Sequence, residues 1–206
     1  MCVKACKIFD QYHKIPFDLS IHLHKIIPMG AGLGGGSSNA AEVLKSLNCL
    51  TGSKLSSEEL LSMAAELGSD CSFFIHKFPA FAEGRGEILS KFDLDLSKYF
   101  MVLVKPDVHV STAAAFSGII AGKNNHNLKN CLLKPIQQWQ NCLVNDFEET
   151  VVRNFPVIRE IKARLLSLGA VYAAMSGSGS TVYGLFDSFP PSADHFKDCS
   201  YFCFKK

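Results

Sequence analysis

The sequence predicts an α+β fold, because it contains both strand-like and helix-like segments. Leu19, Ile21 and Leu23 alternate with polar residues, which predicts a strand with one buried face. Residues 99–104 form a continuous apolar run closed by Lys105-Pro106, which is typical of a central strand. The helical patterns cover residues 2–13, 37–50, 56–67, 136–149 and 156–167.

Composition indicates an ordinary globular chain. With 206 residues, 48% of them apolar and 19% charged, it can bury a core as one large domain or two small ones. The net charge of +2 and the lack of a long basic run argue against nucleic acid as a partner. No run of ~18 apolar residues predicts a membrane span, and residues 1–7 do not read as a secretory signal.

The cysteine pattern predicts free thiols in a reducing cytosol. Cys49, Cys71, Cys131 and Cys142 stand singly within helix or strand patterns, and no CxxC pair occurs among the eight cysteines. This placement argues against a disulfide framework and against a zinc site. A bacterial cytoplasm and a plastid both fit this expectation.

Local signals place the elements of the first half. Thr51-Gly52-Ser53 is predicted to end the helix that begins near Ser37. Ser56 and Glu59 form a capping box that begins the next helix, and Gly68 ends it. Residues 71–75 and 80–83 are predicted to be short strands. The polar stretch at 90–98 is the best domain boundary, which predicts domains at residues 1–92 and 93–206.

The second half shows similar signals. Ser111 and Thr112 are predicted to cap a short helix through Phe116, and residues 122–135 are predicted to form a surface loop. Pro156 is placed in the first turn of a helix. Strands at 170–174 and 181–186 are predicted to flank a second glycine turn, Ser176-Gly177-Ser178-Gly179-Ser180.

The glycine-rich segment at residues 28–41 is the most informative feature of the chain. Glycines crowd residues 30–36, and Ser37 and Ser38 follow at the start of a helix. Without Cβ atoms, backbone N–H groups can approach an anion, and the positive end of the helix points to the same place. We interpret the segment as a phosphate-binding turn.

Three rival interpretations fit this segment less well. A P-loop needs Gly-Lys-Ser/Thr at its end, and no lysine stands there. Gly30-x-Gly32-x-x-Gly35 matches the dinucleotide fingerprint, but Lys54-Leu55 stands where an acidic residue is expected. A flexible linker would not be flanked by Pro28 and a capped helix.

The segment Pro28-Met-Gly-Ala-Gly-Leu-Gly-Gly-Gly-Ser-Ser-Asn-Ala-Ala41 resembles the central motif of the GHMP small-molecule kinases. Residues 67–70 (Leu-Gly-Ser-Asp), 79–87 (Pro-Ala-Phe-Ala-Glu-Gly-Arg-Gly-Glu) and 175–184 narrow the resemblance to the family that phosphorylates 4-diphosphocytidyl-2-C-methyl-D-erythritol on its 2-hydroxyl, in non-mevalonate isoprenoid biosynthesis. The resemblance implies a partial ribosomal-protein-S5-domain-2-like ATP-binding domain followed by a ferredoxin-like substrate domain. A kinase of homoserine, mevalonate or a sugar, and an inactive nucleotide-binding fragment, remain the alternatives.

The resemblance also implies the site residues. ATP and Mg²⁺ are the expected cofactors, with the metal held mainly by phosphate oxygens. The expected nucleotide-binding residues are Lys25, Pro28, Met29, Gly30, Ala31, Gly32, Leu33, Gly34, Gly35, Gly36, Ser37 and Ser38. Lys25 reads equally as a solvated lysine at a strand end. His22 and His24 share a strand face, but without a third ligand we expect an exposed face rather than a metal site.

The family uses the aspartate at the position of Asp70 as the base that accepts or orients the proton of the substrate hydroxyl. From the residues alone, Asp70 reads as a turn aspartate that binds its own backbone. Asp70-Cys71-Ser72 departs from the usual Asp-Val-Pro or Asp-Cys-Pro of the family, which keeps the carboxylate and puts the turn in doubt.

The resemblance places the small-molecule substrate, a cytidine-diphosphate-linked polyol, against four residues of the C-terminal half. Phe116 is expected to stack on the cytosine with Thr112 nearby, and core packing is the alternative for Phe116. Gly177 and Gly179 are expected to shape the wall of the cleft, or to form a tight turn between strands. No membrane partner is expected, and the oligomeric state is open.

Family members carry an upstream region with a lysine in a Lys-Leu-Asn-like segment, which pairs with the catalytic aspartate. No such segment occurs in this sequence. We therefore expect the chain by itself to be unstable or inactive unless that region is supplied.

Overall fold

The computed structural model describes residues 1–76, 78–119 and 127–205, and the chain divides into two compact units. The first unit comprises residues 1–29 and 34–94, and the second comprises residues 30–33 and 95–206. The glycine-rich segment therefore contributes residues to both units. Within the described residues, no helix is both long and apolar enough to cross a membrane.

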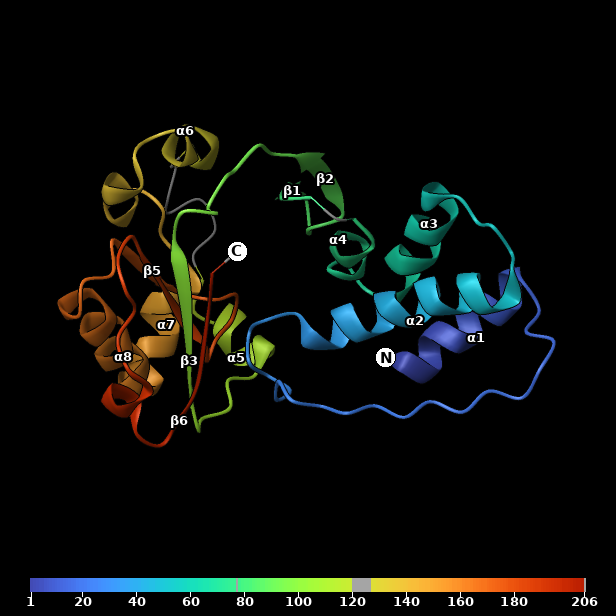
Figure 1. Cartoon of the computed structure of the whole chain (residues 1–206), viewed down its shortest axis with the longest axis horizontal. Helices are drawn as coiled ribbons and strands as arrows, with labels where there is room; N and C mark the ends of the chain where they lie inside the picture. The colour runs from blue at the N-terminus through green and yellow to red at the C-terminus, as the bar shows by residue number, and fades with distance from the viewer. Residues whose placement is uncertain (77, 120–126, 206) are drawn as a thin grey trace. The chain divides into compact units, whose positions relative to one another are not determined.

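The first unit is a cluster of helices with a small hairpin. Its elements are α1 (Cys2–Tyr12), α2 (Gly35–Thr51), α3 (Ser57–Leu67), α4 (Cys71–Ile75), β1 (Ala80–Glu83) and β2 (Ile88–Lys91). Helix α2 packs against α1, α3 and α4, and α1 lies beside it in Figure 1. Leu44 and Leu47 of α2 are buried against Phe9 of α1 and Met63 of α3 in one apolar core. This core fixes the axis of α2, and with it the direction of its N-terminus.

Predicted end signals of these helices are confirmed. Ser56 accepts the N–H of Glu59 through its hydroxyl, and Glu59 accepts the N–H of Ser56, which makes the predicted capping box. Helix α2 ends at Gly52, whose left-handed φ of +64° is one that glycine adopts readily.

Two predicted strands of this unit are wrong. Residues 19–24 form no regular element, because no strand of the described residues pairs with them. Leu19, Ile21 and Leu23 are consequently exposed. Residues 71–75 form helix α4 instead, since α2 and α3 offer an apolar surface and no strand edge.

The second unit is built on an antiparallel sheet with the strand order β4-β5-β3-β6. Its strands are β3 (Phe100–Pro106), β4 (Tyr172–Met175), β5 (Val182–Phe186) and β6 (Cys199–Lys205). Its helices are α5 (Thr112–Phe116), α6 (Leu128–Leu132), α7 (Phe147–Asn154) and α8 (Pro156–Ser167), with short 3-10 helices η1 (Ile136–Asn141) and η2 (Ala193–Phe196). The predicted central strand is confirmed, because β3 pairs with β5 on one side and β6 on the other.

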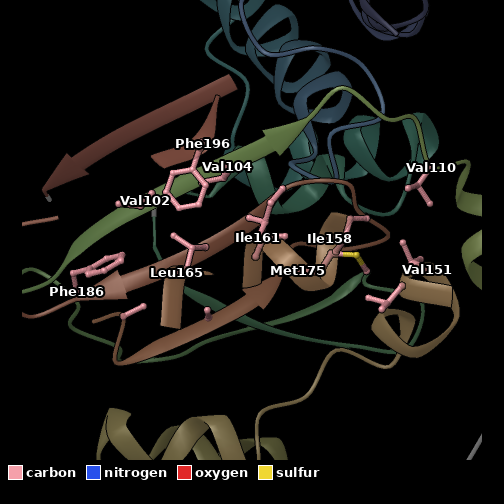
Figure 2. Packing of buried hydrophobic residues seen from close by; sticks show 14 of the residues in the cluster. Val102, Val104, Val110, Val151, Ile158, Ile161, Leu165, Met175, Phe186 and Phe196 are labelled. Atoms are coloured by element: carbon pink, nitrogen blue, oxygen red, sulfur yellow. The ribbon is translucent and has the colours of Figure 1, made fainter. Parts of the chain in front are cut away.

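The core of the second unit lies between this sheet and α8. Val102 and Val104 of β3 belong to one buried cluster with Ile161 and Leu165 of α8, which Figure 2 draws between the sheet and the helix. Both valines are fully buried and alternate with partly exposed neighbours, so one face of β3 carries the core. Helix α8 begins with Pro156, as predicted.

Other predictions for this unit need correction. Residues 128–132 form helix α6 where a surface loop is expected, while residues 122–126 of that loop lie outside the described residues. The helix expected at 136–149 is divided into η1 and α7. Asn145 lies in the break, where its side-chain oxygen accepts the N–H of Phe147 in place of the backbone carbonyl that a continuous helix would have offered.

The prediction that all cysteines are free is wrong for one pair. Cys131 of α6 and Cys142 after η1 form a disulfide with a Cα–Cα distance of 5.9 Å, well within the usual range. The short connection between α6 and η1 brings them together, which spacing alone did not reveal. The free cysteines are Cys2, Cys6, Cys49, Cys71, Cys199 and Cys203.

The capping box predicts a pH-dependent contribution to stability. The Ser56 N–H and hydroxyl lower the pKa of Glu59. A carboxyl group whose pKa is lowered on folding stabilises the folded state above its unfolded pKa, and this is lost as pH falls through the folded pKa. We expect the unfolding free energy of Glu59→Gln to fall below that of the parent at neutral pH and to converge with it as pH falls through the folded-state pKa of Glu59.

Urea titrations between pH 3 and 7 measure this convergence. Glu58→Gln, which removes a first-turn charge outside the capping box, is the matched control. A difference for Glu59→Gln that is constant over the whole pH range contradicts the expectation.

Candidate functional site

The N-terminus of α2 presents backbone N–H groups in the first unit. Gly34 precedes the helix with a left-handed φ of +62°, and an added Cβ would lie 2.8 Å from the ring of Phe74. In the described part of the chain, α2 has no side-chain cap and no acidic residue in its first turn. The first N–H groups of a helix have no partner within it, so this end remains available to an anion.

Lys25 adds a positive charge at the same place. Its ammonium donates to Oδ1 of Asn39 at 2.8 Å and lies 3.0 Å from where a Cβ of Gly35 would stand. Lys25 is not at the end of a strand, so the expected position is reached by an irregular segment. Asn39 was missed as a site residue, although its place one turn into the helix after Ser37-Ser38 was a usable signal.

Asp70 directly precedes helix α4 and is exposed. Within the described residues its carboxylate makes no cap for that helix, contrary to the turn interpretation. The next residue, Cys71, is buried and is hydrogen-bonded to the hydroxyl of Ser37 at the start of α2. Burial raises the pKa of the Cys71 thiol, which keeps it protonated, and the Ser37 hydrogen bond opposes this in part. The Cys71–Ser37 contact links Asp70 to the N-terminus of α2.

The turn between β1 and β2 lies on the other side of Asp70. A Cβ added to Gly86 would lie 3.7 Å from Oδ1 of Asp70. Gly86 has a φ of +102°, which other residues rarely adopt. Glycine at position 86 is therefore required by its backbone conformation, and a Cβ there would make only an ordinary contact with the carboxylate.

Residues 30–33 of the glycine-rich segment pack in the second unit against the turn between β4 and β5. The N–H of Thr181 donates to the carbonyl of Ala31 at 3.2 Å, and the hydroxyl of Ser176 donates to the carbonyl of Gly32 at 2.7 Å. Gly32 has a φ of +73°, and an added Cβ would overlap the carbonyl oxygen of Ser176. Gly177 and Gly179 have φ values of +53° and +89°, so they form the predicted tight turn between strands.

Thr112 and Phe116 lie on α5 in the second unit, where Ser111 caps the helix as predicted. Thr112 is exposed, and the side chain of Phe116 is 59% exposed. The Phe116 ring touches Phe147 edge-on, with centroids 4.8 Å apart. Simple core packing therefore does not describe Phe116, more than half of whose side chain is exposed.

The predicted site residues are thus divided between the units. The first unit contains Lys25, Pro28, Met29, Gly34, Gly35, Gly36, Ser37, Ser38 and Asp70, and the second contains Gly30, Ala31, Gly32, Leu33, Thr112, Phe116, Gly177 and Gly179. In the first unit, contacts join Lys25, the start of α2 and the segment after Asp70. In the second unit, they join Gly32 to the Gly177 turn.

Comparison with known proteins finds matches along much of the chain. Residues 1–77 match the family described as GHMP kinases N terminal domain, and residues 127–194 match GHMP kinases C terminal. A 4-diphosphocytidyl-2-C-methyl-D-erythritol kinase of Bacteroides fragilis is 52% identical over 90% of this chain and 68% of its own length. The protein of the same name from Bacteroides thetaiotaomicron is 47% identical over 100% of this chain and 74% of its own.

Solved structures give the same grouping. A crystal structure of 4-(cytidine 5'-diphospho)-2C-methyl-D-erythritol kinase matches with a TM-score of 0.75 and 31% identity, covering 94% of this chain and 69% of that one. The mevalonate kinase of Methanococcus jannaschii matches with a TM-score of 0.70, covering 100% of this chain and 74% of that one, at 15% identity. At that identity the second likeness shows a shared fold.

Gly32 is predicted to tolerate no side chain. Alanine there meets an unfavourable φ and backbone oxygens of Ser176 and Gly179, the latter at 2.7 Å. Gly169→Ala in the same unit is the matched control, because its φ is +99° and nothing lies within 4 Å of an added Cβ. We expect urea unfolding to show a loss of about 1–2 kcal/mol for Gly169→Ala and at least ~2 kcal/mol more for Gly32→Ala. Equal losses would contradict the packing described.

Proposed function

The chain belongs to the 4-diphosphocytidyl-2-C-methyl-D-erythritol kinase family of GHMP kinases, and we propose that it transfers the γ-phosphoryl group of ATP to the 2-hydroxyl of 4-diphosphocytidyl-2-C-methyl-D-erythritol. The observation that carries the proposal is the uncapped N-terminus of α2 with the Lys25 ammonium beside it. An ammonium beside the N-terminus of a helix favours a polyanion such as a triphosphate.

The glycine-rich segment is proposed to bind the phosphates of ATP. The N–H groups that begin α2 would donate to phosphate oxygens, and Lys25 would neutralise charge on them. Gly34 matters because its φ of +62° turns the chain into the helix, and because a Cβ there would lie 2.8 Å from the ring of Phe74. The hydroxyl of Ser38 adds a further donor on the first turn.

Mg²⁺ is proposed to bind together with the nucleotide. Among the described residues, no group of three or more His, Cys, Asp or Glu side chains could hold a metal ion. We propose that phosphate oxygens of the nucleotide hold most of the ion, with the Ser38 hydroxyl as a ligand from the chain. When bound, the ion neutralises charge that develops on the phosphates.

Asp70 is proposed to act as the general base. Its exposed carboxylate would accept the proton of the 2-hydroxyl as that oxygen bonds to the γ-phosphorus. The bond between the γ-phosphorus and the bridging oxygen breaks at the same time, and ADP leaves with the electron pair. The link from Cys71 to Ser37 supports this role, since it ties the carboxylate to the phosphate-binding helix.

Phe116 and Thr112 are proposed to bind the cytidine part of the substrate. An exposed ring held edge-on by Phe147 presents a face on which cytosine can stack, worth about 1–3 kcal/mol. Thr112 offers a hydroxyl one helical turn away, with which it can read a polar edge of the base.

Nucleotide binding and turnover test this function. We expect Lys25→Met to raise the Kd for MgATP ~10-fold, through loss of a charge-assisted contact. Asp70→Asn is expected to leave the Kd nearly unchanged and to lower kcat ~10²–10⁴-fold. Calorimetry measures binding, and release of ADP in the presence of the cytidyl substrate measures turnover.

Lys197→Met and Asp187→Asn, both exposed positions of the second unit, are the matched controls. The assays use two proteins. One is the chain itself, and the other is a chimera in which the unmatched part of the Bacteroides thetaiotaomicron relative is joined to the chain. Absence of MgATP binding by both proteins would overturn the proposal. Binding without turnover in both would favour an inactive nucleotide-binding protein, and turnover of homoserine or mevalonate in preference would favour another GHMP kinase.

A further inference from the structure

The turn between β4 and β5 fixes two successive peptide groups of the glycine-rich segment. The carbonyl of Ala31 accepts the N–H of Thr181, and the carbonyl of Gly32 accepts the hydroxyl of Ser176. The C=O and N–H of a trans peptide point in opposite directions. Fixing these two carbonyls therefore also fixes the N–H groups of Gly32 and Leu33, which point away from the turn. Successive N–H groups held in this way form an anion-binding concavity.

Asn145 holds this turn from behind. Its side-chain nitrogen donates to the carbonyls of Met175 and Gly177, both at 2.8 Å. These two residues stand on either side of Ser176, so the single amide group sets the position of the Ser176 hydroxyl. Its Oδ1 accepts the N–H of Phe147 at 3.0 Å, which anchors the amide to the start of α7.

Glu148 braces the same strand end. Its Oε1 accepts the N–H of Met175 at 2.7 Å, and its Oε2 is paired with the ammonium of Lys162 on α8. The side chain of Glu148 is only 14% exposed, so this pair is better shielded from solvent than a surface ion pair. The N–H and C=O of Met175 are thus both held from the start of α7.

We propose that Asn145 is a positioning residue for nucleotide binding, acting through Ser176 on the Gly32 and Leu33 amides. This rests on the proposed function, because it assumes that those amides meet phosphate oxygens. The chemistry requires asparagine: two N–H donors in one planar group reach two carbonyls, while the oxygen of the same group accepts a third bond. An aspartate keeps the acceptor and loses both donors, and its charge faces the two carbonyl oxygens.

Three variants test the proposal. Asn145→Asp retains the hydrogen bond from the Phe147 N–H and removes the two hydrogen bonds to the carbonyls of Met175 and Gly177 that position the turn. Ser176→Ala removes only the next link, the hydroxyl on Gly32, and keeps the proposal testable if Asn145→Asp folds poorly. Gln140→Ala is the matched control, because its amide oxygen accepts the N–H of Ala173 on the same strand at 3.1 Å and does not hold the turn.

We expect Asn145→Asp to raise the Kd and KM for MgATP ~10-fold, with less than ~2-fold change in kcat or in the KM for the phosphoryl acceptor. Ser176→Ala should have a similar effect, and the double variant should be no worse than the stronger single variant, since both act on one path. Gln140→Ala should lower the Tm without changing the Kd. An unchanged MgATP affinity in Asn145→Asp, an equal shift in Gln140→Ala, or fully additive effects would each overturn the proposal.

Hydrogen exchange without nucleotide separates this proposal from the proposed function. Asn145→Asp should increase exchange at least ~10-fold in peptides that contain residues 30–33 and 176–181, and Gln140→Ala should not. Increased exchange in a chain that does not bind MgATP would show that the proposed function has failed while the hold on the turn is real. Unchanged exchange would show that Asn145 does not position the segment.

Discussion

Gly32 lies so close to the backbone of the β4–β5 turn that no side chain fits at this position. The packing of residues 30–33 in the second unit depends on this close approach. The carbonyl oxygens of Ser176 and Gly179 occupy the space that any side chain on residue 32 would need. A segment without Cβ atoms can lie against this turn and direct its carbonyls into it. Glycine at position 32 is therefore required by backbone packing.

In the first unit, the glycine-rich segment begins helix α2. From Gly34 onward the chain enters α2, whose apolar face is buried against α1, α3 and α4. Burial of Leu44 and Leu47 makes the helix rigid, and the rigid helix carries its positive end and the neighbouring Lys25 as a fixed charge arrangement. Electrostatic stabilisation is effective when such groups need no reorganisation at the moment of reaction.

Local signals in the sequence predicted what local physics determines. The capping box at Ser56, the helix stop at Gly52 and the proline start of α8 depend on neighbouring residues only, and all three are found. Residues 19–24 and 71–75 have the apolar pattern of strands but find no strand partner among the residues that the structure describes, so their conformation depends on residues far away in the sequence. For the site, the motif predicts Lys25, Asp70 and the glycines, whereas the bonds of Asn39 and Asn145 depend on packing between segments far apart, which spacing does not encode.

The Cys131–Cys142 bridge gives the second unit a covalent component. The bridge spans 11 residues, and closing a loop of roughly this size lowers the entropy of the unfolded chain by an amount worth about 2–3 kcal/mol. The bridged loop contains Trp139, whose ring packs edge-on against Tyr172 of β4 with centroids 5.7 Å apart. Reduction of this disulfide by thiol–disulfide exchange frees the loop that holds Trp139 against Tyr172 of β4. The rigidity of the second unit therefore depends on the redox potential of its surroundings.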